Sequence, residues 1–173
     1  METIDLSSMQ SKDAVRRGRM VRRAVITVVV LFVLAGLLNV FGHKDRTSTA
    51  ITDHWHLSVT HASVSRGGLA SNWSLELRRL DGEDLPEELE VRSRADYFAI
   101  YDENGLDPEP ESSWVDGDDL VWTYRPPPDS ASLVIDFDAR LQPNARWRHP
   151  GRTTIVVAED PVVSVGYETW AVP

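Results

Sequence analysis

The sequence predicts an all-β fold, an immunoglobulin-like or fibronectin-like β-sandwich preceded by one transmembrane α-helix. Eighteen residues without a charge run from Ala24 to Phe41. Beyond them, about eight short segments alternate apolar with polar residues between Gly, Pro and Asp clusters, and no amphipathic helical pattern occurs. We therefore expect four parts: a basic cytoplasmic tail (1–23), a transmembrane helix (24–42), a tether (43–52) and an extracytoplasmic β-sandwich domain (53–173).

The run from Ala24 to Phe41 is long enough to cross a bilayer. At ~1.5 Å per residue, eighteen helical residues extend about 27 Å, close to the thickness of the hydrocarbon core. A cleaved signal peptide is the alternative, because Ser48-Thr49-Ala50 offers small residues to a peptidase. However, the run exceeds the ~7 to 15 apolar residues usual in such peptides, and Lys44-Asp45-Arg46 would precede the cut. The pattern favours a membrane anchor.

The flanking charges predict the orientation of this helix. A basic cluster precedes the apolar run, whereas Lys44 and Arg46 alone follow it closely. The topology signal consists of Arg16, Arg17, Arg19, Arg22 and Arg23. Because basic flanks stay in the cytoplasm, we expect a single-pass protein of the cell membrane with a cytoplasmic N-terminus and an extracytoplasmic C-terminal domain. The lipid bilayer is thus its first predicted partner.

Composition excludes several classes of function for the outer domain. The chain has 18 Lys and Arg and 27 Asp and Glu; the first 23 residues hold six and three of these, which leaves 12 and 24 beyond them. Such an acidic domain repels phosphate backbones, so nucleic acid is not an expected partner. The absence of cysteine excludes disulfides and thiolate metal sites. No cofactor and no small-molecule substrate is predicted.

Period-two alternation predicts the strands. The clearest one runs from Leu133 to Arg140, where Leu133, Ile135 and Phe137 would face the core and Asp136 the solvent. Further strands are expected at His54–Val59, Trp73–Arg78, Leu89–Ser93, Tyr97–Tyr101, Leu120–Tyr124, Thr153–Ala158 and Pro161–Trp170. The last two would form a hairpin joined by Glu159-Asp160-Pro161.

Several phrases of the sequence resemble a known protein family. They are SVTHASVSRGGLASNWSLELRR, DYFAIYDENGLDPEPES, VWTYRPPPDSASLVIDFDAR and VVSVGYETWAVP, together with the basic tail and the apolar helix. In these the chain is similar to a family of single-pass membrane proteins of actinobacteria. The resemblance covers the anchor and Trp55 to Pro173, and it implies a β-sandwich outer domain in a bacterial envelope. That family has no assigned activity, so no functional residues follow from it.

Two sets of residues are candidate sites. Trp147 between Arg146 and Arg148, with Trp114, forms a possible binding surface, because Trp and Arg dominate the energetics of protein interfaces. The alternative is that the guanidinium groups simply pack on a loop aromatic. The acidic segment with Asp102, Asn104 and Asp107 offers oxygen ligands for calcium, although its spacing does not match an EF-hand and a solvated turn explains it equally.

These features favour an interaction module over an enzyme. The sequence holds no nucleophile elbow or other local catalytic signature. We expect a membrane-anchored module that binds or modulates another envelope protein. The alternatives are a protein that binds or acts on cell-wall glycan and a calcium-stabilised stalk.

Overall fold

The computed structural model describes residues 6–37 and 44–172, with side chains described at 15–34, 36–37, 44–102 and 105–172. The chain forms two compact units, Met1–Gly42 and His43–Pro173. The first unit is helical, and the second holds the strands.

The first unit contains one helix, α1 (Leu6–Leu37). It includes the arginines of the predicted topology signal and the first part of the predicted membrane segment; residues 38–42 of that segment lie outside the described residues. Of the helices in the described part of the chain, none combines the length and the apolar character needed to cross a membrane. The transmembrane helix at 24–42 therefore stays a prediction of the sequence.

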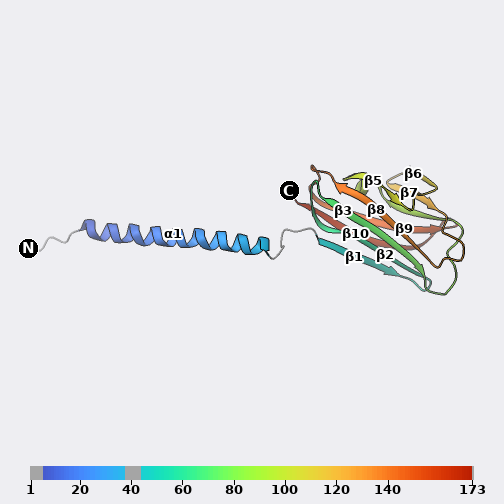
Figure 1. The fold of residues 1–173 in the computed structure, drawn as a ribbon, viewed down its shortest axis with the longest axis horizontal. Coiled ribbons are helices and arrows are strands. Elements are labelled where there is room, and N and C mark those ends of the chain that lie inside the picture. Colours follow the sequence, from blue (N-terminus) through green and yellow to red (C-terminus); the bar gives the residue numbers. More distant parts are fainter. Residues whose placement is uncertain (1–5, 38–43, 173) are drawn as a thin grey trace, which may run out of the picture. The chain divides into compact units, whose positions relative to one another are not determined.

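The second unit is built almost entirely from strands (Figure 1). Its elements are β1 (Lys44–Ile51), β2 (Trp55–Arg66), β3 (Ala70–Arg79), β4 (Leu89–Arg94), α2 (Ala95–Phe98), β5 (Tyr101–Asp107), β6 (Ser112–Asp116), β7 (Asp119–Tyr124), β8 (Ser132–Leu141), β9 (Trp147–Val157) and β10 (Asp160–Val172). The all-β prediction for this unit is confirmed.

The strands form one hydrogen-bonded sheet that folds over on itself. Its order is β5-β8-β3-β2-β10-β9-β4-β7-β6, with β1 paired to β2 outside this path. In a flat sheet, five strand spacings of about 4.8 Å would put β3 and β7 roughly 24 Å apart. Instead the ring centroids of Trp73 on β3 and Trp122 on β7 lie 6.2 Å apart. The two halves of the sheet thus face each other as the layers of a sandwich.

The layers meet along β2. Its first part pairs antiparallel with β3, whereas Val64 to Arg66 pair in parallel with Trp170 to Val172 of β10. Between these parts the inward and outward alternation breaks, because the neighbours His61 and Ala62 are both buried. β1 follows β2 along its other side, with a register shift between Lys44 and Asp45. β2 therefore passes from one layer to the other at His61.

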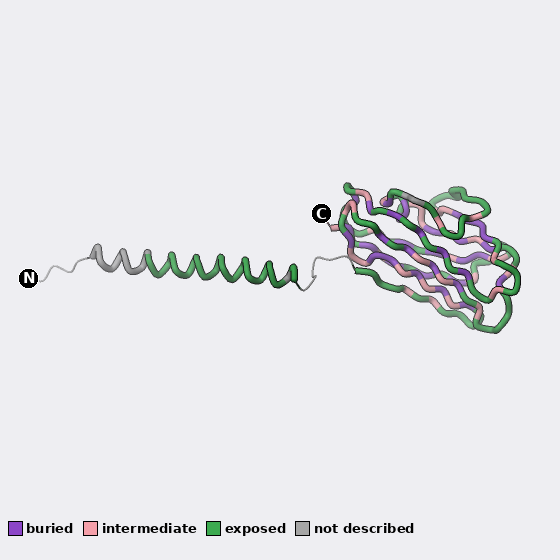
Figure 2. Tube along the Cα trace, in the orientation of Figure 1, coloured by how far each residue is buried: buried purple, intermediate pink, exposed green. Residues whose placement is uncertain are grey.

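The core lies between the layers, and burial alternates along most of the central strands as the sequence predicts (Figure 2). In β7 it does not, because Val121 to Tyr124 are all buried. In β8, Leu133, Ile135, Phe137 and Ala139 are buried while the residues between them are exposed. The same alternation holds for the predicted inward residues Trp55, Leu57, Val59, Trp73, Leu75, Leu77, Leu89, Val91, Val163, Val165 and Tyr167. The prediction of the core is confirmed.

Four local predictions are wrong. The segment Tyr97–Tyr101 is not a strand, because Tyr97 and Phe98 lie in the short helix α2, where both are buried. Most of the tether at 43–52 is strand β1, hydrogen-bonded to β2. The acidic segment after Tyr101, read as a loop, contains β5 and β6. These three missed strands are polar and pair on one side only, so they carry no apolar alternation.

The fourth concerns the last hairpin, whose turn is shorter than predicted. Val157 pairs with Asp160, so only Ala158 and Glu159 form the turn. Both have positive φ, at 50° and 70°, which is the backbone of the two-residue turn that matches strand twist. Asp160 and Pro161 belong to β10.

Candidate functional site

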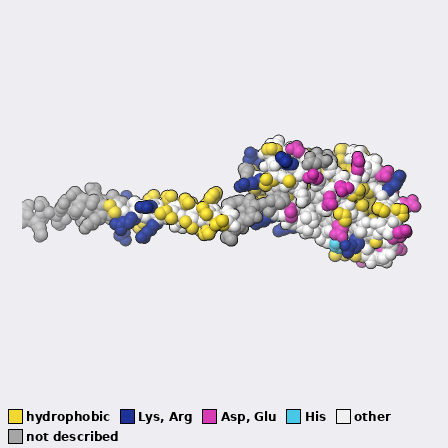
Figure 3. Space-filling view, in the orientation of Figure 1, with side chains coloured by type: hydrophobic (Ala, Val, Ile, Leu, Met, Phe, Trp, Pro, Cys, Tyr) yellow, Lys and Arg dark blue, Asp and Glu magenta, His cyan; other side chains and the backbone are white. Residues whose placement is uncertain are grey.

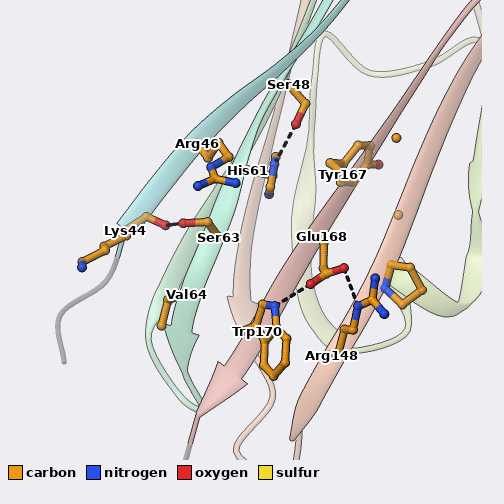
Figure 4. Close-up of a pocket in the computed structure, with 13 residues that line it drawn as sticks. Lys44, Arg46, Ser48, His61, Ser63, Val64, Arg148, Tyr167, Glu168 and Trp170 are labelled. Carbon is orange, nitrogen blue, oxygen red and sulfur yellow. Dashed lines mark hydrogen bonds and ion pairs between the residues drawn. The ribbon is translucent and has the colours of Figure 1, made fainter. Parts of the chain in front are cut away.

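An open groove of about 700 Å³ lies where β1 and β2 diverge from β9 and β10 (Figure 4). Its wall on one side carries Lys44 and Arg46 of β1 and His61 of β2. The opposite side carries Arg148 of β9 and Glu168 and Trp170 of β10. All four strands contribute, so the groove exists only in the folded domain.

Strand periodicity places these side chains. Lys44 and Arg46 are two residues apart on an extended strand and so share one face of β1. On β10, Tyr167 faces the core, so Gly166 and Glu168 face outward into the groove. A Cβ at Gly166 would meet no heavy atom within 4 Å. The floor of the groove is therefore open above Gly166.

The groove is locally cationic on an acidic domain. Lys44, Arg46 and Arg148 bring three positive charges to its lining, and Glu168 brings the negative charge. On the face drawn in Figure 3, Lys and Arg side chains gather toward the end of the domain where β1 begins, and Asp and Glu side chains predominate over the other end. The lining of the groove thus has a net positive charge, although the domain as a whole is acidic.

Glu168 accepts one hydrogen bond at each of its two carboxylate oxygens. Its carboxylate accepts hydrogen bonds from Nε of Arg148 and from Nε1 of Trp170. The hydrogen bond from Arg148 is the main reason that the pKa of Glu168 lies below its usual value. Glu168 thus orients Arg148 and Trp170. Lys44 and Arg46 form no ion pair with a described residue, so they are the free cations of the groove.

His61 adds no charge to the groove at neutral pH. Burial lowers its pKa and outweighs the hydrogen bond to the carbonyl of Ala62, which raises it. The contacts assign the tautomer: Nδ1–H donates to the Ala62 oxygen at 3.3 Å, and Nε2 accepts from Ser48 Oγ at 3.3 Å. Its ring packs 5.1 Å from that of Tyr167, between centroids. His61 is a wall of the groove and a neutral hydrogen-bonded group.

A buried polar network lies under the groove. The Tyr167 hydroxyl accepts from Nε1 of Trp73 at 3.2 Å and lies 2.9 Å from Thr153 Oγ1, which lies 2.8 Å from Ser93 Oγ. Burial raises the pKa of Tyr167 far above its usual value, so the phenol stays protonated. These hydroxyls bond to one another in the core, so the network joins the two layers.

Of the four predicted binding residues, Arg148 lines the groove, and Arg146 and Trp147 directly precede it in the chain. Trp147 begins β9 and is 76% exposed, with a left-handed backbone at φ 73°. Arg148 follows it and lines the groove, while Arg146 precedes it in an exposed turn. Trp170, 48% exposed and paired with Arg148 across β9 and β10, was not predicted. The alternation along β10, which turns position 170 outward, was the signal for it.

Trp114 lies elsewhere. It is 40% exposed on edge strand β6, level with Val121, Arg92 and Thr154 on the neighbouring strands. Thr154 is seven residues along β9 from Trp147. Three strand spacings and seven residues of rise separate Trp114 from Trp147 by roughly 27 Å. The two tryptophans therefore do not form one surface.

The predicted calcium ligands are not brought together. Asp102 and Asp107 lie on β5, opposite Arg140 and Asp136 of β8. Five residues of extended strand separate them by about 16 Å, whereas calcium ligands lie within about 2.6 Å of one ion. The side chain of Asn104 is outside the described side chains. Among the described residues, no group of three or more His, Asp or Glu could hold a metal ion.

Comparison with known proteins assigns the chain to no family. No protein-family model and no curated protein matches it. Its fold is similar to the CARDB domain of the PF1109 protein from Pyrococcus furiosus, solved with di-metal ions, at 11% identity and a TM-score of 0.40 over 71% of this chain and 93% of that one. Likeness at this level says nothing of what this chain binds.

Two further solved structures are similar to the same degree. The third cohesin of ScaC, solved with the ScaB dockerin from Acetivibrio cellulolyticus, matches at 11% identity and a TM-score of 0.39, over 64% of this chain and 95% of that one. The collagen-binding domain of a Staphylococcus aureus adhesin matches at 7% identity and a TM-score of 0.39, over 70% and 99%.

Proposed function

We propose that this chain is a membrane-anchored interaction module that binds another envelope protein through the Trp147 surface, formed by Arg146, Trp147 and Arg148. The observation that carries the proposal is Trp147 itself. It is 76% exposed, and its backbone is left-handed at φ 73°.

This conformation is costly for a bulky residue. A side chain with a Cβ loses about 1 kcal/mol in the left-handed region, and Trp leaves a large apolar area in water when it is exposed. Residues held in such backbone regions cluster at binding sites, where the strain serves to present a side chain. The indole of Trp147 contributes little to the core of its own domain, so its use lies outside that domain.

Its neighbour Arg148 is already oriented for contact. Glu168 accepts the hydrogen bond from Arg148 Nε, which holds in place the guanidinium of the residue that follows Trp147. A side chain fixed before binding loses less conformational entropy when a partner docks. Trp and Arg are the residue types that carry most of the energy of protein interfaces.

The location belongs to the same proposal and rests on the sequence. Ala24 to Phe41 is free of charge and follows a cluster of arginines, which supports an anchor with a cytoplasmic N-terminus and an extracytoplasmic β-domain. The resemblance to actinobacterial membrane proteins supports a bacterial envelope. The partner would then be another protein of that envelope.

Partner capture tests the binding surface. The full chain, expressed in its own host and solubilised in detergent, is expected to co-purify with a stoichiometric protein. Trp147→Ala should lose that protein, and Trp114→Ala should retain it, because Trp114 is also exposed but lies on β6 far from the surface. Equal capture by both variants would refute the proposal, as would repeated recovery of the chain alone.

Cysteine labelling tests the topology. The chain has no cysteine, so a single introduced thiol reports its own position. A membrane-impermeant maleimide applied to intact cells should label Glu87→Cys, on an exposed loop of the β-domain, and should label Ser11→Cys only after lysis. The reverse pattern would invert the topology, and labelling of both in intact cells would exclude a membrane-spanning anchor.

A further inference from the structure

We infer that the groove between β1 and β10 binds the phosphate headgroup of an anionic phospholipid, with Lys44 and Arg46 as its cations. The inference rests on the proposed membrane anchoring, but it concerns a ligand other than the protein partner of the Trp147 surface. The groove and that surface adjoin at Arg148.

The charges of the groove favour binding of an anion. Lys44 and Arg46 form no ion pair with a described residue, and they share one face of β1 within the same groove. Glu168 does not neutralise them, because its oxygens hold Arg148 and Trp170. The lining of the groove therefore carries two positive charges that no described carboxylate pairs with, and phosphate is an anion that Lys and Arg bind together.

The shape of the groove leaves room for that anion. Figure 4 shows Lys44 and Arg46 on one side and Glu168, Arg148 and Trp170 on the other. The floor at Gly166 is open, since a Cβ there would meet nothing within 4 Å. An acidic group entering between the walls can approach Arg46 directly, whereas the Lys44 side chain, which Figure 4 shows extending away from the groove, must turn toward it.

The rim indicates an amphiphilic ligand instead of a soluble one. Trp170 lines the groove and is 48% exposed, and the apolar Val64 lies next to it across the pairing of β2 and β10. Indole rings with Lys and Arg are the side chains that settle at the boundary between lipid headgroups and water. A phospholipid supplies both the phosphate and the apolar part that such a rim accommodates.

Chain connectivity permits contact with a membrane. Lys44 begins β1, and residues 38–43 separate it from Leu37 at the end of α1. Only these six residues come between Leu37 and Lys44 in the sequence, so Lys44 is close along the chain to the proposed anchor. Basic residues this near an anionic surface are attracted to it over about a Debye length.

Hydrogen exchange of the full chain in lipid nanodiscs tests the inference. We expect peptides from β1 and β10 to exchange several-fold more slowly in discs of phosphatidylcholine with phosphatidylglycerol than in discs of phosphatidylcholine alone. Lys44→Gln with Arg46→Gln should abolish the difference. The control pair Arg125→Gln and Arg140→Gln, which removes the same charge at exposed sites on other elements, should keep it.

The outcomes separate this inference from the anchoring on which it rests. Failure of the chain to co-elute with either disc would refute the anchoring. Co-elution with equal exchange in both discs would overturn the headgroup inference alone. Protection in phosphatidylcholine discs by soluble glycerol phosphate, or by a glutamate hexapeptide, without an effect of phosphatidylglycerol, would assign the groove to a free phosphate ester or to an acidic protein segment instead.

Discussion

Gly151 of β9 lies directly under the ring of Tyr167 of β10. A Cβ at Gly151 would come within 2.2 Å of Cε2 and 2.7 Å of Cδ2 of Tyr167, distances that no real contact permits. The absence of a side chain at Gly151 is therefore what lets Tyr167 turn inward beneath the groove and reach Trp73. One glycine thus determines the position of a buried hydroxyl that joins the two layers.

Gly151→Ala should destabilise the β-domain by about 1 to 3 kcal/mol, because the ring must move and the surrounding core must be overpacked. Gly166→Ala is the matched control on the facing strand, where a methyl group meets open space and should change little. Urea unfolding followed by tryptophan fluorescence measures both, since all six tryptophans belong to the β-domain. Equal stability of the two variants would contradict the packing described.

Tyr167→Phe should cost about 1 to 3 kcal/mol, because it leaves the buried Trp73 Nε1–H without its acceptor. Tyr124→Phe is the comparison, since the buried Tyr124 hydroxyl has no hydrogen-bond partner in the described part of the chain. Its removal should be neutral or stabilising. The two free energies of unfolding, measured under the same conditions, should differ in this order, and the opposite order would refute the network.

Acid should destabilise the domain through His61. Burial and Arg46 lower its pKa below 6.5 in the folded state, although Ala62 and Asp45 act in the opposite sense. As the pH drops below 6.5, His61 therefore binds a proton in the unfolded chain but stays neutral in the folded chain. The free energy of unfolding falls accordingly. The free energy of unfolding then changes by up to about 1.4 kcal/mol per pH unit.

His61→Gln removes this proton-linked term, so its unfolding free energy should depend less on pH than that of the natural chain between pH 7.5 and 5. The measurement is the urea midpoint across that range. Parallel curves for the two proteins would show that His61 is not held neutral in the folded domain.

Trp147→Gly should leave the domain at least as stable as the natural chain. Glycine relieves the left-handed backbone at φ 73°, worth about 1 kcal/mol, and an indole that is 76% exposed has little packing to lose. Trp147→Ala keeps a Cβ and should gain nothing. Thermal unfolding of both variants checks this; a clear loss of stability in Trp147→Gly would mean that the ring supports the fold.

Ala158→Asn with Glu159→Gly should raise the free energy of unfolding by about 1 kcal/mol. Both positions have positive φ in the turn between β9 and β10, and Asn-Gly is the pair that this turn prefers. The urea midpoint of the double variant measures the effect. An unchanged or lower midpoint would argue against the two-residue turn.

The buried strands were predictable because each has its own alternation of apolar and polar residues. In β8, every second residue from Leu133 to Ala139 is apolar, since one face meets the core and the other meets water. The edge strands β1, β5 and β6 lack this alternation. They are held by backbone hydrogen bonds to a single neighbour, and backbone groups are the same in every residue.

The candidate site divides in the same way. Trp147 and its flanking arginines could be identified because they are adjacent in the chain. Lys44, Arg46 and His61 could not be joined to Arg148 and Trp170, because the groove depends on β2 leaving one layer for the other at His61. Asp102 and Asp107, close in sequence, lie apart because the segment between them is extended.

By itself, the sequence determined the all-β class of the domain, the faces of its central strands, and the contrast between a basic front segment and an acidic remainder. Those properties depend on composition and on the period of two, which are local. Only the tertiary structure decided which strands pair, where the layers meet, and which cations share the groove. Those relationships depend on hydrogen bonds and packing between residues far apart in the chain, and no local pattern records them.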